Sequence, residues 1–167
     1  FQIKGRPFHE PKFATESGRA SFHAVDLPPL QGGPDELRLM TVRSEGQFNT
    51  VVYEEEDIYR NQERRDVILM HPDDIKARGL HVDQPVTVSS ATGSMRHILV
   101  RPFDIRSGNA MMYFPEANVL VPKTTDARSK TPAFKNVCVT VTPEGDSNFV
   151  PSERLRYSGS SSRFRQG

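Results

Sequence analysis

Residues 37–53, LRLMTVRSEGQFNTVVY, are the stretch on which the predicted fold depends. From Leu37 to Arg43 the side chains alternate in the two-residue period of a half-buried strand. Ser44-Glu45-Gly46 breaks this strand, and an apolar run at 51–53 predicts a second one. A hairpin turn needs only the glycine, so the additional polar side chains between residues 41 and 50 require another explanation. We interpret them as a loop that holds a ligand.

The sequence beyond this stretch also divides into short elements. Val67–Met70 has the apolar character of a buried strand. Pro72 and the two acids after it predict a short helix, with Gly79 as the residue that follows its end. Residues 85–101 alternate on both sides of a turn at 91–93, which is the pattern of a hairpin.

These elements favour a mainly β fold. Thirteen prolines and eleven glycines indicate many turns, and NVCVTVTP at 136–143 supplies a closing strand. Short strands need protected edges, which closure into a barrel provides. We predict a barrel with one or two short helices at residues 36–143, a lead-in segment at 1–35 and a flexible, disordered tail at 144–167.

Two stretches are less well defined by their sequence. SGRASFHAV, residues 17–25, predicts a strand after a turn within the lead-in segment. The strongly charged run EEEDIYRNQERRD, residues 54–66, fits a short helix or a solvated loop. We interpret it as a solvated excursion, with a docking surface as the alternative.

Composition excludes several classes of function. The chain has 22 basic and 21 acidic residues, so its net charge predicts neither a nucleic-acid partner nor a membrane partner. No segment approaches the roughly 20 apolar residues of a membrane span, and we predict no membrane insertion. The single cysteine, Cys138, excludes an internal disulfide and an iron–sulfur cluster. We expect it to be buried in a strand, and a cytoplasmic location fits this cysteine usage.

Four blocks in a fixed order carry a family resemblance. They are LRLMTVRSEGQFNT (37–50), VILMHPDDIKARGLHVDQPVTVSSATG (67–93), EANVLVP (116–122) and DARSKTPAFKNVCVTV (126–141). Together they resemble the C-terminal cofactor-binding domain of the molybdopterin oxidoreductases, particularly the formate-dehydrogenase-like alpha subunits. The resemblance implies a double-psi β-barrel that closes over one side of a bis-molybdopterin guanine dinucleotide cofactor in the complete enzyme.

The chain lacks the family's large catalytic domains and its molybdenum ligand. We therefore expect it to be the C-terminal piece of a larger molybdenum oxidoreductase, with formate as one expected substrate and no activity of its own. Its partners would be the pterin cofactor and the catalytic domains of the same polypeptide, and any iron–sulfur cluster would lie outside this chain. The alternative is a stand-alone β-barrel module that binds a protein partner or a nucleotide. A self-processing decarboxylase of similar topology is disfavoured, because TGS at 92–94 reads as a hairpin turn.

The candidate cofactor-binding residues combine three kinds of hydrogen-bonding group. Arg binds planar or anionic groups through its fork of donors, whereas Asn and Gln both donate and accept and therefore match ring amides. The resemblance implies that the segment ending in Lys135 lies against the pterin. The candidates are Thr41, Arg43, Gln47, Asn49, Thr50, Asn118, Ser129 and Lys135.

Each candidate also has a structural interpretation. Residues 41–50 fit an ordinary polar hairpin loop, Asn118 fits an amide that fixes its own turn, and Lys135 fits a surface lysine at the start of a strand. The five histidines are dispersed without the spacing of a metal site. We predict no catalytic residue and no metal ligand in this chain.

Overall fold

The computed structural model of the protein describes residues 13–27, 29–44, 46–47 and 54–145. Its contacts divide the chain into two units, Phe1–Leu30 and Gln31–Gly167. The described residues of the first unit contain a turn, in which Gly18 N donates to the Thr15 carbonyl, and no helix or strand. The strand predicted at 17–25 is therefore wrong. A strand requires ladder partners, and none pairs with this segment in the described chain.

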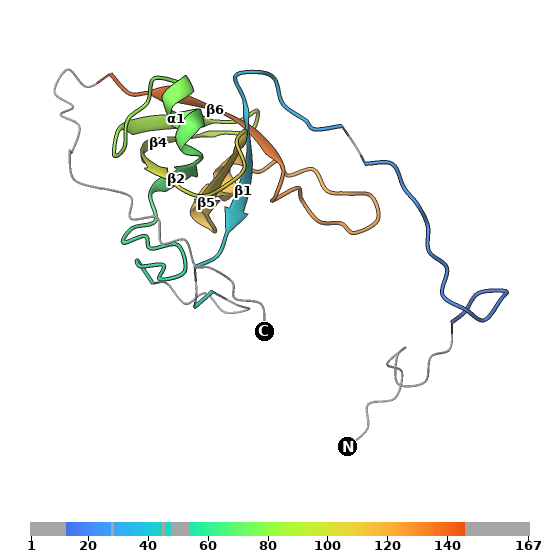
Figure 1. Cartoon of the computed structure of the whole chain (residues 1–167). Helices are drawn as coiled ribbons and strands as arrows, with labels where there is room; N and C mark the ends of the chain where they lie inside the picture. Colours follow the sequence, from blue (N-terminus) through green and yellow to red (C-terminus); the bar gives the residue numbers. More distant parts are fainter. Residues whose placement is uncertain (1–12, 28, 45, 48–53, 146–167) are drawn as a thin grey trace, which may run out of the picture. The chain divides into compact units, whose positions relative to one another are not determined.

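Within the described part of the second unit, six short strands close into a barrel (Figure 1). The strands follow the order β1-β5-β2-β4-β3-β6 around it. They are β1 (Leu37–Val42), β2 (Val67–Met70), β3 (Pro85–Ser89), β4 (Ser94–Pro102), β5 (Asn109–Tyr113) and β6 (Val137–Pro143). Closure gives every strand two neighbours, so no edge of the barrel is left open. The mainly β barrel predicted from the sequence is confirmed.

Two pairs of neighbouring strands run parallel. β1 pairs with β5, which places Leu39 beside Ala110, and β2 pairs with β4, which places Ile68 beside Val100. All other neighbours are antiparallel. The connection from β1 to β5 contains both β2 and β4, so one parallel pair is nested within the other along the chain. A closed barrel with these two crossover connections agrees with the double-psi barrel that the resemblance implies.

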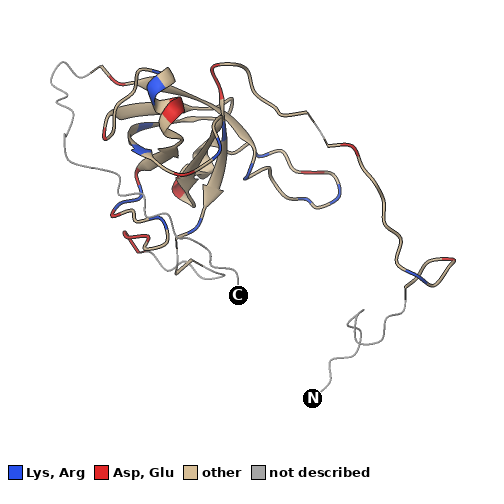
Figure 2. Ribbon diagram, viewed as in Figure 1, with Lys and Arg blue, Asp and Glu red and all other residues tan. Residues whose placement is uncertain are grey.

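The barrel interior is filled with apolar side chains from alternate strand positions. In β1 the inward residues include Leu37 and Leu39, and in β3 they are Val86 and Val88, all fully buried. Successive side chains on a strand point to opposite faces, which explains this period of two. Most strand residues carry no charge, as Figure 2 shows. Burial of each such side chain contributes roughly 1.5–3 kcal/mol.

The short strand β2 is buried on both faces. Ile68 and Met70 belong to the core inside the barrel, whereas Val67 and Leu69 pack in a second apolar cluster that includes Tyr113. A strand covered on both sides has a continuous apolar sequence rather than an alternating one. The VILM run predicted a buried strand for this reason, and the structure confirms it.

The predicted helix forms as α1 (Pro72–Ala77). It begins after His71, whose ring Nδ1 accepts a hydrogen bond from Asp73 N at 3.1 Å. Gly79 follows the helix with a φ of 62°, the left-handed conformation that glycine adopts without strain after a helix end. Both ends of α1 therefore match the sequence signals.

Asp74, in the first turn of α1, also holds the turn before β5. Its buried carboxylate accepts hydrogen bonds of 2.7 Å from the Ser107 hydroxyl and from Gly108 N. Arg78, one turn along, lies 3.8 Å from the same carboxylate. Asp74 thus ties α1 to the turn that leads into β5.

The TGS stretch at 92–94 belongs to the turn between β3 and β4, as predicted. Ser90 Oγ accepts a hydrogen bond from Gly93 N (3.3 Å) and donates to the carbonyl of Leu120 (2.8 Å) in the 3-10 helix η1 (Glu116–Leu120). A Cβ on Gly93 would lie 2.7 Å from the carbonyl oxygen of Val119. The glycine therefore allows the hairpin turn to pack closely on η1.

β6 ends at Pro143, and the next residue remains attached to the barrel. Glu144 accepts hydrogen bonds from the Thr87 hydroxyl (2.7 Å) and from His97 N (3.0 Å). These two bonds hold the pKa of the Glu144 carboxyl below its usual value. From residue 146 onward, the tail predicted to be flexible lies outside the described residues.

Cys138 differs from its predicted position. It is half-buried rather than buried, because β6 turns Val137 and Val139 into the core and Cys138 toward the other face. Among the described residues, no helix has the length and apolar character needed to cross a bilayer.

Candidate functional site

A pocket of about 490 Å³ opens where β1 and β5 end. Its walls come from four stretches that are far apart along the chain. Its lining residues are Thr41, Val42, Arg43, Arg60, Phe114, Phe134 and Lys135. We refer to it as the basic pocket, because Arg43, Arg60 and Lys135 supply its charges among the described residues.

The parallel pairing of β1 with β5 places two of these walls together. Parallel strands end on the same side, so Val42 lies beside Tyr113, and Phe114 N donates to the Val42 carbonyl at 2.8 Å. Phe114 therefore continues β5 at the point where the β1 chain turns away. The guanidinium carbon of Arg43 lies 5.2 Å from the centroid of the Phe114 ring, which is a cation–π distance.

The third wall is held to β1 by main-chain groups of Thr41. Thr41 N donates to the carbonyl of Phe134 at 2.9 Å, and the ammonium group of Lys135 donates to the carbonyl of Thr41. Both bonds fix the segment before β6 against the last residues of β1. The end of β1, the residue after β5 and the segment before β6 therefore form most of the pocket wall, and the loop at 54–66 adds Arg60.

The pocket concentrates positive charge. Partial burial lowers the pKa of Lys135 first, and the nearby charges of Arg43 and Arg60 lower it further. A bound anion would relieve this repulsion. Three cations beside two aromatic rings match a ligand that is both flat and anionic.

Arg60 is held by a buried carboxylate behind the pocket. Asp57 Oδ2 lies 2.6 Å from the Arg60 guanidinium and accepts a hydrogen bond of 2.8 Å from the Tyr113 hydroxyl. Asp57 and Tyr113 are each 1% exposed. Arg60 also donates to the carbonyl of Arg43 at 3.1 Å, which links the excursion at 54–66 to the end of β1.

A second buried cation, Arg65, lies at the other end of the same excursion. It donates to Glu116 (2.6 Å), to the Ser44 hydroxyl (2.9 Å) and to the carbonyl of Phe114 (2.6 Å). Its guanidinium carbon lies 4.9 Å from the centroid of the Tyr113 ring. Arg65 therefore joins its excursion to the end of β1 and to residues 114–116, which include Phe114 of the basic pocket.

A second hollow of about 630 Å³ lies beside Arg65 and Glu116. Its lining is largely acidic, but several of the acids are paired. Arg65 bonds Glu116, and Glu63 lies 3.5 Å from the guanidinium of Arg101. The lining of this hollow mixes acids with cations, whereas the charged residues that line the basic pocket are all cations, so this hollow is a weaker candidate for an anionic ligand.

The structure brings three of the predicted site residues together. Thr41, Arg43 and Lys135 line the basic pocket. Asn49 and Thr50 lie outside the described residues.

Gln47 is 4% exposed, and its Oε1 accepts hydrogen bonds from Ser44 N (3.2 Å) and Arg65 (3.3 Å). Its Nε2 is buried without a hydrogen-bond partner in the described structure. The side-chain oxygen of Gln47 therefore stabilises the loop, whereas the N–H donors of its Nε2 are not used by any described group.

The other two predicted residues do not line the basic pocket. Asn118 is exposed on η1, where its main chain bonds Pro115 and Val121. Ser129 is exposed in a turn, where its hydroxyl accepts a hydrogen bond from Thr131 N at 3.3 Å. For both, the structure supplies the local structural role, and a role in cofactor binding remains a prediction.

Sequence reasoning missed Arg60, Phe114 and Phe134. Phe134 lies within the predicted SKTPAFK segment, directly before Lys135, and an aromatic next to a candidate cation was a usable signal. Arg60 stands in a run of charged residues and had no distinguishing signal of its own. Asp57, whose burial fixes Arg60, was likewise treated as one of four consecutive acids.

No group of His, Cys, Asp and Glu in the described residues is arranged to hold a metal ion. The three cations and two aromatic rings of the basic pocket suit an organic anion. The family model for the Molydopterin dinucleotide binding domain matches residues 37–138, which is more than half of the chain. The chain belongs to this family.

Two curated relatives extend the match over most of the chain. An uncharacterized oxidoreductase of Mycobacterium bovis is 34% identical over 154 residues, which is 86% of this chain and 20% of the relative. Protein YdeP of Escherichia coli is 27% identical over 146 residues, which is 80% of this chain and 19% of the relative. The chain thus spans about a fifth of the length of the curated relatives that it matches.

Among solved structures, acetylene hydratase from Pelobacter acetylenicus matches 64% of this chain and 18% of its own chain. The TM-score is 0.49 and the sequence identity 14%. Family membership assigns a molybdopterin-type cofactor to this domain.

Proposed function

We propose that the basic pocket binds the molybdopterin-type cofactor of this family. The observation that carries the proposal is the convergence of Arg43, Arg60 and Lys135 beside Phe114 and Phe134. A pterin dinucleotide has flat rings and negatively charged phosphates. Arginine forks and a lysine ammonium suit the phosphates, and aromatic faces suit the rings.

The donors of the site fit such a ligand. Arg43 stacks near Phe114, and Arg43, Arg60 and Lys135 line one pocket, so their charges can act on the same anion. The buried, unpartnered Nε2 of Gln47 is a further donor near the end of β1. When bound, the cofactor supplies the redox chemistry, whereas these residues bind and orient it.

The finer parts of the function are also proposals. We propose that the cofactor is bis-molybdopterin guanine dinucleotide with molybdenum, and that the parent protein is a formate-dehydrogenase-like oxidoreductase located in the cytoplasm. The four resembling blocks and the oxidoreductase names of the mycobacterial relatives support this. The remaining domains of the same polypeptide would then be the partners of the barrel and would supply the catalytic groups.

Titration of the isotope-labelled chain with guanosine diphosphate tests the cofactor-binding role. This nucleotide carries the guanine, ribose and pyrophosphate of the proposed cofactor. We expect amide shifts at residues 41–43, 60 and 134–135, and binding weakened about tenfold or more by Arg43→Ala or Lys135→Ala, because each removes a charge-assisted bond.

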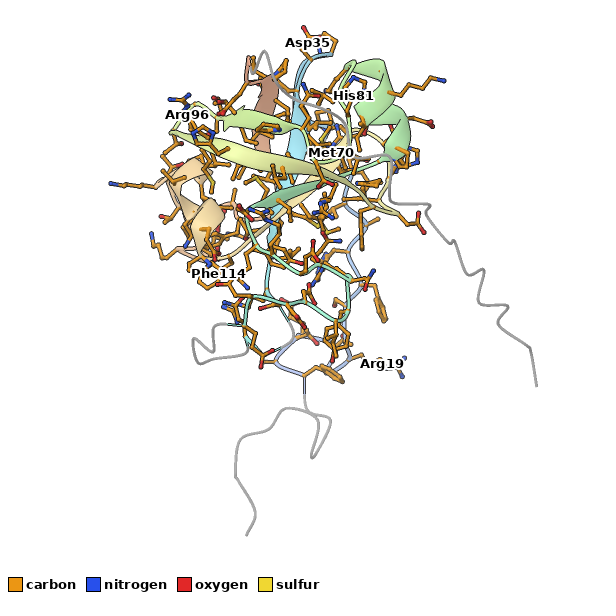
Figure 3. The ribbon with its side chains drawn as sticks, turned by 90° about the vertical axis from the view of Figure 1, so that its left-hand side faces the viewer. Arg19, Asp35, Met70, His81, Arg96 and Phe114 are labelled. Atoms are coloured by element: carbon orange, nitrogen blue, oxygen red, sulfur yellow. The ribbon has the colours of Figure 1, made fainter. Side chains whose placement is uncertain are left out.

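Arg96→Ala is the matched control for Arg43→Ala. Arg96 has a side chain that is 70% exposed on β4 and does not line the basic pocket, and Figure 3 shows it well apart from Phe114. Its loss should leave the affinity unchanged. Shifts that avoid the basic pocket, or equal effects of all the arginine variants, would overturn the proposed site and favour a stand-alone module that binds its ligand elsewhere.

The proposed substrate is tested on the full-length protein that contains this domain. We expect formate-dependent reduction of an artificial electron acceptor by the cofactor-loaded enzyme. Loaded enzyme without formate-dependent reduction would overturn the formate-dehydrogenase-like role and leave the cofactor-binding role standing.

A further inference from the structure

We infer that Asp57 is a positioning residue for the cofactor pocket. Its carboxylate accepts a hydrogen bond from the Tyr113 hydroxyl and holds the Arg60 guanidinium toward the ligand. This inference rests on the proposed function, because it assigns a task to one wall of the same pocket. It also changes the interpretation of the charged run at 54–66. Under this inference, the run is part of the binding site rather than a solvated excursion.

The contacts define a short chain of interactions from the barrel to the pocket. The Tyr113 hydroxyl, at the end of β5, donates to Asp57 Oδ2 at 2.8 Å, and the same oxygen lies 2.6 Å from the Arg60 guanidinium. Asp57 Oδ1 accepts a separate hydrogen bond from Tyr59 N at 3.1 Å. Both carboxylate oxygens are therefore used.

The main chain around Asp57 is fixed as well. Asp57 N donates to the carbonyl of Gln62 at 2.7 Å, and Gln62 N donates back at 3.1 Å. This closes residues 57–62 into a small loop whose carboxylate is buried and whose arginine reaches the pocket. Arg60 keeps 23% of its side chain exposed, as a residue that must meet a ligand requires.

A buried carboxylate is costly unless it is paired and hydrogen-bonded, so its presence at this place needs a reason. A free arginine side chain loses rotamer freedom when it binds a ligand. Asp57 fixes the guanidinium before binding, and this preorganisation lowers the entropy cost of association. A carboxylate with only a structural role also needs a cation partner, but that partner need not line a pocket, as Arg78 beside Asp74 does not.

The sign of the effect on binding separates positioning from simple electrostatics. Removal of a negative charge near an anion site should strengthen anion binding if Asp57 acts only through its charge. If Asp57 positions Arg60, its neutralisation should weaken binding. We expect Asp57→Asn to weaken guanosine diphosphate binding about tenfold, close to the loss of one charge-assisted bond.

Two further variants sharpen the test. Tyr113→Phe removes only the hydroxyl that holds Asp57 and should weaken binding less than Asp57→Asn does. In an Arg60→Ala background, Asp57→Asn should no longer weaken binding, because the side chain that it positions is absent.

Asp74→Asn is the matched control, because Asp74 is also a buried carboxylate that holds a loop, but its cation partner Arg78 does not line the basic pocket. A readout without ligand is the Arg60 side-chain Nε–H signal by NMR. We expect it to be distinct in the unaltered chain and in Asp74→Asn, and to approach that of a free arginine in Asp57→Asn.

Tighter or unchanged binding by Asp57→Asn, while Arg43→Ala still weakens binding, would overturn the positioning role and leave the proposed function standing. An equal loss in Asp74→Asn and Asp57→Asn would also overturn it, because the effect would then be general to the fold. No binding by the unaltered chain would overturn both proposals.

Discussion

Two charged excursions leave the barrel, and they are built in different ways. The first covers residues 54–66, and the second covers residues 123–131; Figure 2 shows acidic and basic residues in both. In the first, Asp57 and Arg65 are buried, whereas every residue from 123 to 131 is exposed. Charge content alone therefore does not distinguish a wall of a site from a solvated loop.

The difference lies in where the polar groups find their partners. In the first excursion, Asp57 bonds Tyr113 of β5, and Arg65 bonds Ser44 and Glu116. In the second, Asp126 accepts hydrogen bonds from Ser129 N (2.7 Å) and Arg128 N (3.0 Å), within its own turn. Partners in the barrel give the first excursion a fixed position, and local partners give the second only a local shape.

The largest expected effect comes from removal of the buried cation of the first excursion. Arg65→Met should lower the free energy of unfolding by about 3–5 kcal/mol, because it leaves Glu116 and the Phe114 carbonyl without their donor. Urea unfolding monitored by circular dichroism measures this. Arg128→Met, in the second excursion, should change the free energy of unfolding by less than about 0.5 kcal/mol. Similar losses in both variants would erase the distinction between the excursions.

A smaller effect is expected where the first excursion meets β5. Tyr113→Phe keeps the buried ring and deletes the hydroxyl that bonds Asp57, so unfolding should become easier by about 1–2 kcal/mol. Burial, and then Asp57, raise the pKa of Tyr113, so the hydroxyl donates throughout the ordinary pH range. Thermal unfolding is the measurement. A variant as stable as the parent would mean that the buried bond adds nothing to the attachment of this excursion.

The barrel was largely predictable from the sequence, and the physical reasons are local. Alternation at Leu37 and Leu39, the apolar run at 67–70 and the turn before Ser94 each specify an element without knowledge of the others. The pairing order was not readable in this way, because ladders join residues that are far apart in the chain. The family resemblance implied a double-psi barrel, and the structure supplies the order of its strands.

The site was predictable only in part. Thr41, Arg43 and Lys135 stand at strand ends, where polar side chains in an apolar context attract notice. Asp57 and Arg60 were not predicted as site residues, because the hydrogen-bond partner of the buried Asp57 is Tyr113, 56 positions away. A run of charges is solvated by default, and only such a distant partner reverses that expectation.

A pH-dependent effect is expected at Lys135, where the chain from the second excursion returns to the barrel. Its folded-state pKa lies below the ordinary value of 10.5 because of burial and of Arg43 and Arg60. Between these two pKa values the unfolded chain binds more protons, so this group makes stability rise with pH in that window. Lys135→Met should remove this rise, measured as the free energy of unfolding while the pH is raised toward the ordinary lysine value of 10.5. The same slope in both proteins would contradict the cationic crowding of the pocket.

The smallest effect is expected in the second excursion. Hydrogen bonds from Ser129, and then Arg128, lower the pKa of the exposed Asp126 carboxyl below 3.8. Its contribution to stability is present above that value and is lost as pH falls through the folded pKa. Asp126→Ala should leave the free energy of unfolding at pH 7 nearly unchanged. It should only slightly reduce the fall of this free energy as the pH is lowered. A marked loss at pH 7 would show that this turn is anchored as firmly as the first excursion.

Amide hydrogen exchange, measured on the chain with and without guanosine diphosphate, tests the central claim most directly. Asp57 N and Gln62 N bond across one loop, and Asp126 N and Lys130 N bond across the other, so the two pairs differ mainly in attachment to the barrel. The account predicts exchange at least about tenfold slower in the first pair, slowed further by ligand, with the second pair unaffected. Equal exchange in the two loops, or a response to ligand in the second loop alone, would contradict it.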